Sequence, residues 1–62
     1  MASTLTNEAR DEAITRAVAI LETLRDEYLA DAESADNDYI AIAHRAQAMA
    51  LETAITRIQT TF

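Results

Sequence analysis

The most constraining feature of this 62-residue chain is that it contains neither glycine nor proline. Tight hairpin turns that need a positive φ are disfavoured without glycine, and the usual helix breaker is missing without proline. No segment longer than a few residues alternates apolar and polar side chains as a half-buried strand does. The sequence therefore predicts an all-α protein, and its length allows one domain at most, over residues 1–62.

The clearest helical pattern covers residues 40–62, and the helix itself is expected at about 38–60. On a helical wheel of about 100° per residue, one stripe of this segment is apolar except for a polar pair, His44 and Gln47. The stripe consists of Ile40, His44, Gln47, Leu51, Ile55, Ile58 and Phe62. This stripe predicts a helix that buries one side against a partner.

The partner is a second predicted helix at about 7–33. Its candidate N-caps, whose side-chain oxygens can accept from a free N–H, are Thr4, Thr6 and Asn7. Its expected ion pairs are Glu12–Arg16 and Glu22–Arg25. The apolar arc of this helix spans about 180°, which is more than one neighbouring helix can cover.

A turn is predicted at 34–38, because Ser, Asp and Asn side chains compete for the local backbone and make good caps. Asn37 suits the left-handed position that glycine usually takes after a helix. The alternative is one uninterrupted helix, but the stripes centred on Ile14 and Leu51 would then point about 100° apart. A break is favoured, with antiparallel pairing of residues whose numbers sum to about 72. This alignment places His44 beside Tyr28.

A chain this short is marginally stable alone and usually needs an additional device. It has no cysteine and one histidine, which excludes disulfides, thiolate metal sites and a multi-histidine zinc site within one chain. Oligomerisation is the stabilising device that remains, and an apolar line on the outer side of residues 38–60 supports it. The sequence thus predicts a homodimer of two-helix hairpins that forms a four-helix bundle. The expected dimer interface is Ile20, Leu29, Ile42, Ala46, Met49 and Thr53.

One polar group is expected within the seam between the helices, consisting of Arg25, Tyr28, His44 and Gln47. The favoured interpretation is a hydrogen-bonded layer that sets the alignment of the helices. The alternative is a pocket or proton-sensitive layer, or a small ligand or metal site centred on His44. No nucleophile or carboxylate lies on the stripe, so we predict no catalytic residue, no bound metal and no cofactor.

Acidic residues gather around the predicted turn without a base among them. They are Asp26, Glu27, Asp31, Glu33, Asp36 and Asp38. Acids at the end of a helix oppose its dipole, so this cluster breaks a local rule. The favoured interpretation is a solvated tip that keeps the protein soluble. A basic protein partner and a divalent cation are the alternatives, although the spacing does not match an EF-hand loop.

The chain carries eleven acidic residues and five basic ones, for a net charge of −6. Binding to nucleic acid or to an anionic membrane is therefore disfavoured. No apolar run approaches the roughly 20 residues of a membrane span, and the first residues lack the features of a signal peptide. We expect a soluble, cytoplasmic protein.

The predicted architecture resembles that of the Rop family, whose plasmid-encoded RNA-binding hairpins dimerise into four-helix bundles. The likeness covers the length, the single hairpin and an alanine-rich interface, without a shared motif. It implies a four-helix bundle and, as an alternative function, RNA binding. The acidic helix at 7–33 departs from the basic RNA-contacting surface of that family. The function predicted first is a non-enzymatic protein–protein interaction or regulatory module.

Overall fold

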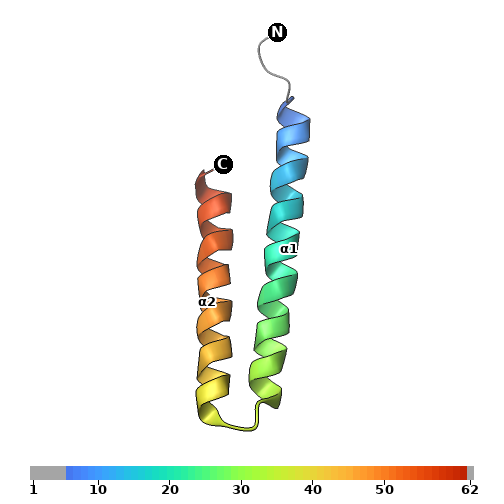
Figure 1. Cartoon of the computed structure of the whole chain (residues 1–62). Coiled ribbons are helices and arrows are strands. Elements are labelled where there is room, and N and C mark those ends of the chain that lie inside the picture. The colour runs from blue at the N-terminus through green and yellow to red at the C-terminus, as the bar shows by residue number, and fades with distance from the viewer. Residues whose placement is uncertain (1–5, 62) are drawn as a thin grey trace.

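The computed structural model describes residues 6–61, which form two antiparallel helices (Figure 1). Helix α1 spans Asn7–Ser34 and helix α2 spans Asp38–Thr61. Residues 35–37 join them, and the described residues contain no strand. The prediction of an all-α hairpin is therefore confirmed. The first turns of α1 extend beyond the end of α2 (Figure 1).

Helix α1 begins at a side-chain cap. The Oγ1 atom of Thr6 accepts a hydrogen bond of 3.0 Å from the backbone N–H of Ala9. Glu8 lies in the first turn, where the helix dipole favours negative charge. Of the three candidate caps, Thr6 is the one used, Asn7 is the first helical residue, and Thr4 lies outside the described residues.

The turn between the helices needs no left-handed residue. Ala35 is extended, with φ −67° and ψ 139°, and its N–H donates to the carbonyl oxygen of Ala32 at 3.4 Å. The Oδ1 atom of Asn37 accepts from the backbone N–H of Ile40 at 2.9 Å, so Asn37 caps the start of α2. No residue in 6–61 has a positive φ. The left-handed role predicted for Asn37 is therefore wrong.

The two helices meet along a narrow seam in which inward residues are spaced alternately by three and four positions. This spacing is the heptad pattern of coiled coils, which keeps the contact line on one side of each helix. On α1 the seam residues are Ile14, Val18, Leu21, Arg25, Tyr28 and Ala32. On α2 they are Ala41, His44, Ala48, Leu51, Ile55 and Ile58.

The seam of α2 lies to one side of the predicted stripe. Ile40 and Gln47 are exposed, whereas Ala41 and Ala48 are buried. The predicted placement of Ile40 and Gln47 within the seam is therefore wrong. Phe62, the last residue of the predicted stripe, lies outside the described residues. A physical reason is size: α1 presents Arg25 and Tyr28 to this part of α2, and alanine leaves room for such long side chains.

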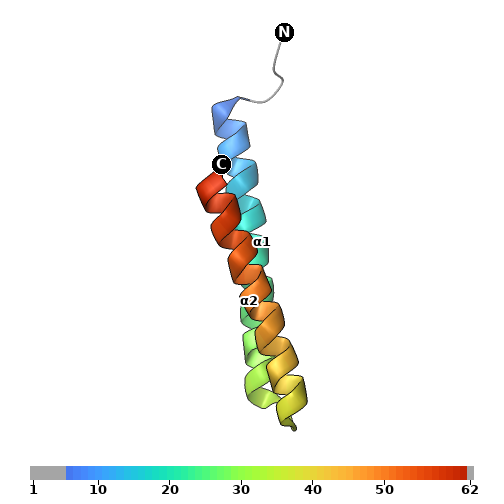
Figure 2. The ribbon, with the colours of Figure 1, turned by 90° about the vertical axis from the view of Figure 1, so that its left-hand side faces the viewer.

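The hairpin is a single layer with dimensions of 55 × 16 × 13 Å. Seen from the side, α2 lies in front of α1 along most of its length with a slight crossing (Figure 2). Two helices that lie side by side make one layer, and the described residues contain no further helix or strand. Both broad sides of the layer therefore face outward, and no described element covers either of them.

The two broad sides are defined by the seam. A residue just before a seam position is rotated by about 100° from it, and in antiparallel helices this puts such residues on the same broad side. We call this side the alanine face; it holds Ala13, Ala17, Ile20, Leu24, Glu27 and Asp31 of α1 and Ile40, Ala43, Gln47, Ala50, Ala54 and Arg57 of α2. Arg10 lies on the same side of α1, because the spacing of three and four continues from Ala13 to Arg10.

The opposite side consists of residues just after a seam position, and we call it the acidic face. It holds Thr15, Ala19, Glu22, Asp26, Leu29 and Glu33 of α1. From α2 it holds Ile42, Arg45, Met49, Glu52, Thr56 and Gln59. The direct contact of Arg25 with both Asp26 and Glu52 agrees with the placement of these two acids on one side.

The six residues predicted at the dimer interface are all exposed, but they do not share one side. Ile20 is on the alanine face, whereas Leu29, Ile42 and Met49 are on the acidic face. Ala46 and Thr53 lie on the edge of α2 that points away from α1. One flat contact with a second copy covers only part of this set.

The seam predicts where truncation destabilises the fold. Ile55 is only 3% exposed, and we expect Ile55→Ala to lower the free energy of unfolding by about 2–5 kcal/mol, because it removes packed methylene groups and leaves a cavity. Ile42→Ala is the matched control, since Ile42 is 60% exposed and should change stability by much less. Chemical denaturation followed by circular dichroism measures both. Equal losses would contradict the observed seam.

Candidate functional site

The middle of the seam holds a polar group contributed by both helices. The rings of Tyr28 and His44 lie with their centroids 5.6 Å apart and their planes tilted by 35°. Both side chains are half-buried. The predicted alignment therefore places these two residues together correctly. The two side chains contact each other through their rings, and such aromatic pairs stabilise beyond the area they bury.

Arg25 is the charged residue of this group and joins the helices. Its Nη1 atom donates to Oε1 and Oε2 of Glu52 at 2.7 and 3.2 Å, and its Nε atom donates to Oδ1 of Asp26 at 3.0 Å. These hydrogen bonds, first to Asp26 and then to Glu52, raise the pKa of the Arg25 guanidinium. A raised pKa means that the charged form is favoured in the folded state. The guanidinium is therefore charged at neutral pH, where the bridge is present.

Two predictions about this group are corrected by the structure. Gln47 is exposed on the alanine face, so it is not part of the layer. Arg25 pairs with Asp26 and Glu52 and not with Glu22 as expected, whereas the Glu12–Arg16 pair forms at 2.9 Å. The sequence reasoning missed Glu52, although its position directly after the seam residue Leu51 places it beside α1. The position of Glu52 relative to the seam could have identified it from the sequence.

The acidic residues near the turn do not form one cluster. Asp26 and Glu33 are on the acidic face, with Asp26 hydrogen-bonded to Arg25, whereas Glu27 and Asp31 are on the alanine face. Asp36 lies in the turn, and Asp38 is in the first turn of α2, where the dipole stabilises it. Among residues 6–61, no group of three or more His, Asp or Glu side chains is arranged to hold a metal ion.

A hollow of about 460 Å³ opens on the acidic face near the free ends of the helices. Its floor is formed by the seam residues Ile14, Val18 and Ile58. Its rim includes Thr15, Glu22 and Gln59. The hollow is open rather than enclosed, and its rim combines apolar and acidic groups. Such a surface suits contact with a partner protein better than enclosure of a small molecule.

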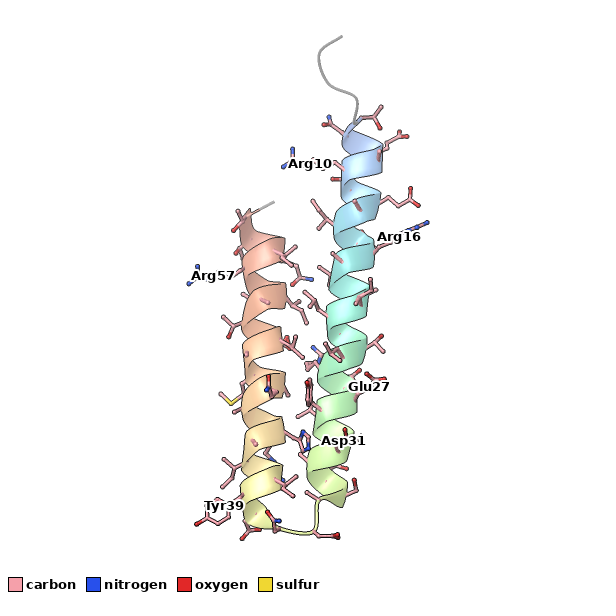
Figure 3. The ribbon with its side chains drawn as sticks, viewed as in Figure 1. Arg10, Arg16, Glu27, Asp31, Tyr39 and Arg57 are labelled. Atoms are coloured by element: carbon pink, nitrogen blue, oxygen red, sulfur yellow. The ribbon has the colours of Figure 1, made fainter. Side chains whose placement is uncertain are left out.

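The largest apolar side chains outside the seam are exposed on both faces and on the outer edge of α2. They are Ile20, Leu24, Leu29, Tyr39, Ile40, Ile42 and Met49. Tyr39 points away from α1 beside the turn (Figure 3). No helix within the described residues is long and apolar enough to cross a membrane. The chemistry offered by the exposed residues is thus burial of apolar surface flanked by carboxylates.

The bridge predicts a difference between two arginines. Arg25→Gln should lower the melting temperature more than Arg16→Gln, because the Arg25 side chain is 24% exposed and links α1 to α2. The Arg16 side chain is 76% exposed and pairs within its own helix, where ion pairs contribute little. Thermal unfolding of both variants at neutral pH measures this. A larger effect from Arg16→Gln would be evidence against the bridge.

Comparison of the chain with protein-family models, with curated proteins and with solved structures gave no match.

Proposed function

We propose that this chain is a non-enzymatic protein–protein interaction module that acts as a homodimer of helical hairpins. The observation that supports this most strongly is the small interior. Among the described residues, five apolar residues are buried: Val18, Ala32, Ala41, Ala48 and Ile55. Three of the five are alanines, which bury little surface. Apolar side chains on the two broad faces remain in water, and their burial by another protein is favourable.

The accessible surface points the same way. The chain exposes 4957 Å². A compact monomer of 6.8 kDa is expected to expose about 4000 Å². The excess of about 1000 Å² is similar to the roughly 800 Å² that each partner buries in a standard protein–protein interface. If a second copy covered one broad face, the accessible surface area of the chain would fall to about that of a compact protein of the same mass.

The other broad face remains for a different partner. On the acidic face Ile42 and Met49 are 60% and 71% exposed. The carboxylates of Glu22 and Glu33 flank this apolar strip on α1, and Arg45 lies between Ile42 and Met49 along α2. A basic amphipathic helix is the partner that this combination suits, because its apolar stripe would bury against Ile42 and Met49 while its cations meet the carboxylates.

Self-association is tested by sedimentation equilibrium at micromolar concentration. We expect twice the chain mass of 6.8 kDa, because burying one face removes apolar surface from water. A mass of one chain at concentrations up to about 100 times higher would contradict the homodimer, since a functional dimer of this kind needs at least micromolar affinity.

Partner binding is tested by calorimetric titration with a synthetic peptide of leucine and lysine in a helical repeat. We expect binding that weakens with added salt and that is strongly reduced by Met49→Glu, because this change places a charge in the apolar strip. Thr60→Glu is a control of equal charge, located away from the strip near the end of α2.

Equal binding by Met49→Glu and the unchanged chain would show nonspecific attraction to a protein of net charge −6 and would contradict a docking strip. A structured RNA serves as the second probe. Binding of this RNA to the chain at low salt that disappears at high salt would favour the RNA-binding alternative instead.

A further inference from the structure

We propose that the two copies pack through their alanine faces in antiparallel orientation, with Ile20 of both subunits at the two-fold axis. This inference rests on the proposed homodimer and assigns its face and its orientation. It starts from the charges of the alanine face, which are separated along the length of the rod. Arg10 and Arg57 lie toward the free ends of the helices, and Glu27 and Asp31 lie toward the turn (Figure 3).

The residues of α1 on this face are complementary in size and charge to the same residues of an antiparallel copy. They run Arg10, Ala13, Ala17, Ile20, Leu24, Glu27, Asp31, spaced alternately by three and four positions. In an antiparallel pair of α1 helices centred on Ile20, Ala17 lies opposite Leu24 of the partner subunit. Arg10 then lies opposite Asp31 of the partner subunit. Ile20 meets its own copy at the axis, Leu24 faces the small Ala17, Ala13 faces Glu27, and Arg10 meets the opposite charge of Asp31, which favours interdigitation around the axis and electrostatic complementarity at the ends.

Helix α2 is compatible with the same two-fold axis. The alignment that places His44 beside Tyr28 places residue 52 of α2 level with Ile20. The residues of the alanine face that flank this level are Ala50 and Ala54. Two alanines on each side of the axis allow the α2 helices of the two subunits to approach closely. The centre deduced from α1 is thus also a point where α2 has no bulk to obstruct the contact.

The alternative arrangements bring like charges together. If the alanine faces met in parallel orientation, Arg10 and Arg57 would gather at one end of the dimer and Glu27 and Asp31 at the other. If the acidic faces met in antiparallel orientation, α1 would bring Glu22 and Glu33 toward the acids of the same helix in the other copy, and Arg25 is already paired with Asp26 and Glu52 of its own chain. Like charges in contact oppose association, so the antiparallel alanine-face dimer is favoured.

The ion pairs at the ends use groups that are accessible. Arg57, Glu27 and Asp31 are exposed, and none of them forms an ion pair with another described residue. Arg10 already interacts within its own chain. Its guanidinium carries five N–H donors and can serve a second carboxylate as well. The apolar centre at Ile20 and Leu24, rather than the ends, supplies the burial.

The face is tested with a matched pair of variants. Ile20 and Met49 are 67% and 71% exposed on opposite faces, so Ile20→Glu and Met49→Glu place the same charge at equally exposed sites. Sedimentation equilibrium should give the mass of one chain for Ile20→Glu, because two carboxylates would meet at the axis. It should give the mass of two chains for Met49→Glu. A dimer disrupted by Met49→Glu and unaffected by Ile20→Glu would overturn the assignment of the face.

The orientation is tested without disturbing either face. The chain has no cysteine, so Asp36→Cys in the exposed turn takes one spin label per subunit. In the antiparallel dimer the labels lie at opposite ends, about 50 Å apart from a rise of 1.5 Å per residue on each side of Ile20. A distance below about 20 Å would place the turns together and overturn the antiparallel orientation.

The two tests also separate this inference from the proposed function. A dimeric unchanged chain with a short label distance, or with the reversed response of the two glutamate variants, refutes the alanine-face arrangement and leaves the homodimer standing. A monomeric unchanged chain refutes the homodimer itself, and the alanine-face arrangement with it.

Discussion

Two helices that lie side by side can shield only one stripe of each other from water, and the rest of this structure depends on that constraint. The seam is one heptad line on each helix, and it buries only five of the described apolar residues. Alanines at 41 and 48 bring the helices close, and Val18 and Ile55 supply much of the remaining bulk. With no second layer, the apolar residues outside the seam are left on a surface, and this is the basis of the homodimer that we propose.

The seam includes a polar group that reduces the apolar surface it buries. Arg25 and His44 occupy positions where apolar residues would bury more hydrophobic surface. In these positions Arg25 hydrogen-bonds to acids on both helices, and the rings of His44 and Tyr28 form a tilted contact. No buried side-chain nitrogen or oxygen among residues 6–61 lacks a partner. Because shifted alignments would separate these partners, we infer that the group specifies one alignment of two otherwise repetitive helices.

The two broad faces have different chemistry because the residues on either side of each seam position differ. Residues before the seam positions are rich in alanine and have opposite charges at opposite ends. Residues after them combine the acids Glu22, Asp26, Glu33 and Glu52 and the single base Arg45 with Leu29, Ile42 and Met49. The first pattern is complementary to its own reversed copy, and the second is complementary to a basic amphipathic surface. One short hairpin can in this way support both self-association and partner binding, as we propose.

Much of the local structure could be predicted from the residues alone. The absence of glycine and proline, the apolar periodicity and the polar segment at 34–38 led to two helices whose ends lie within one residue of those observed. The opposition of Tyr28 and His44 followed from the position of the turn. These features depend on the backbone and on near neighbours in the chain, so the sequence carries them directly.

The side of α2 that enters the seam was decided by the tertiary structure. Judged by hydropathy, Ile40 and Gln47 lie on the main stripe, but Ala41 and Ala48 are the buried residues because Arg25 and Tyr28 need room across the seam. The bridge from Arg25 to Glu52 and the capping role of Asn37 depend equally on distances in space. Periodicity determines that a helix has an apolar side, whereas the shapes and charges of the opposing side chains determine how far it rotates to meet its neighbour.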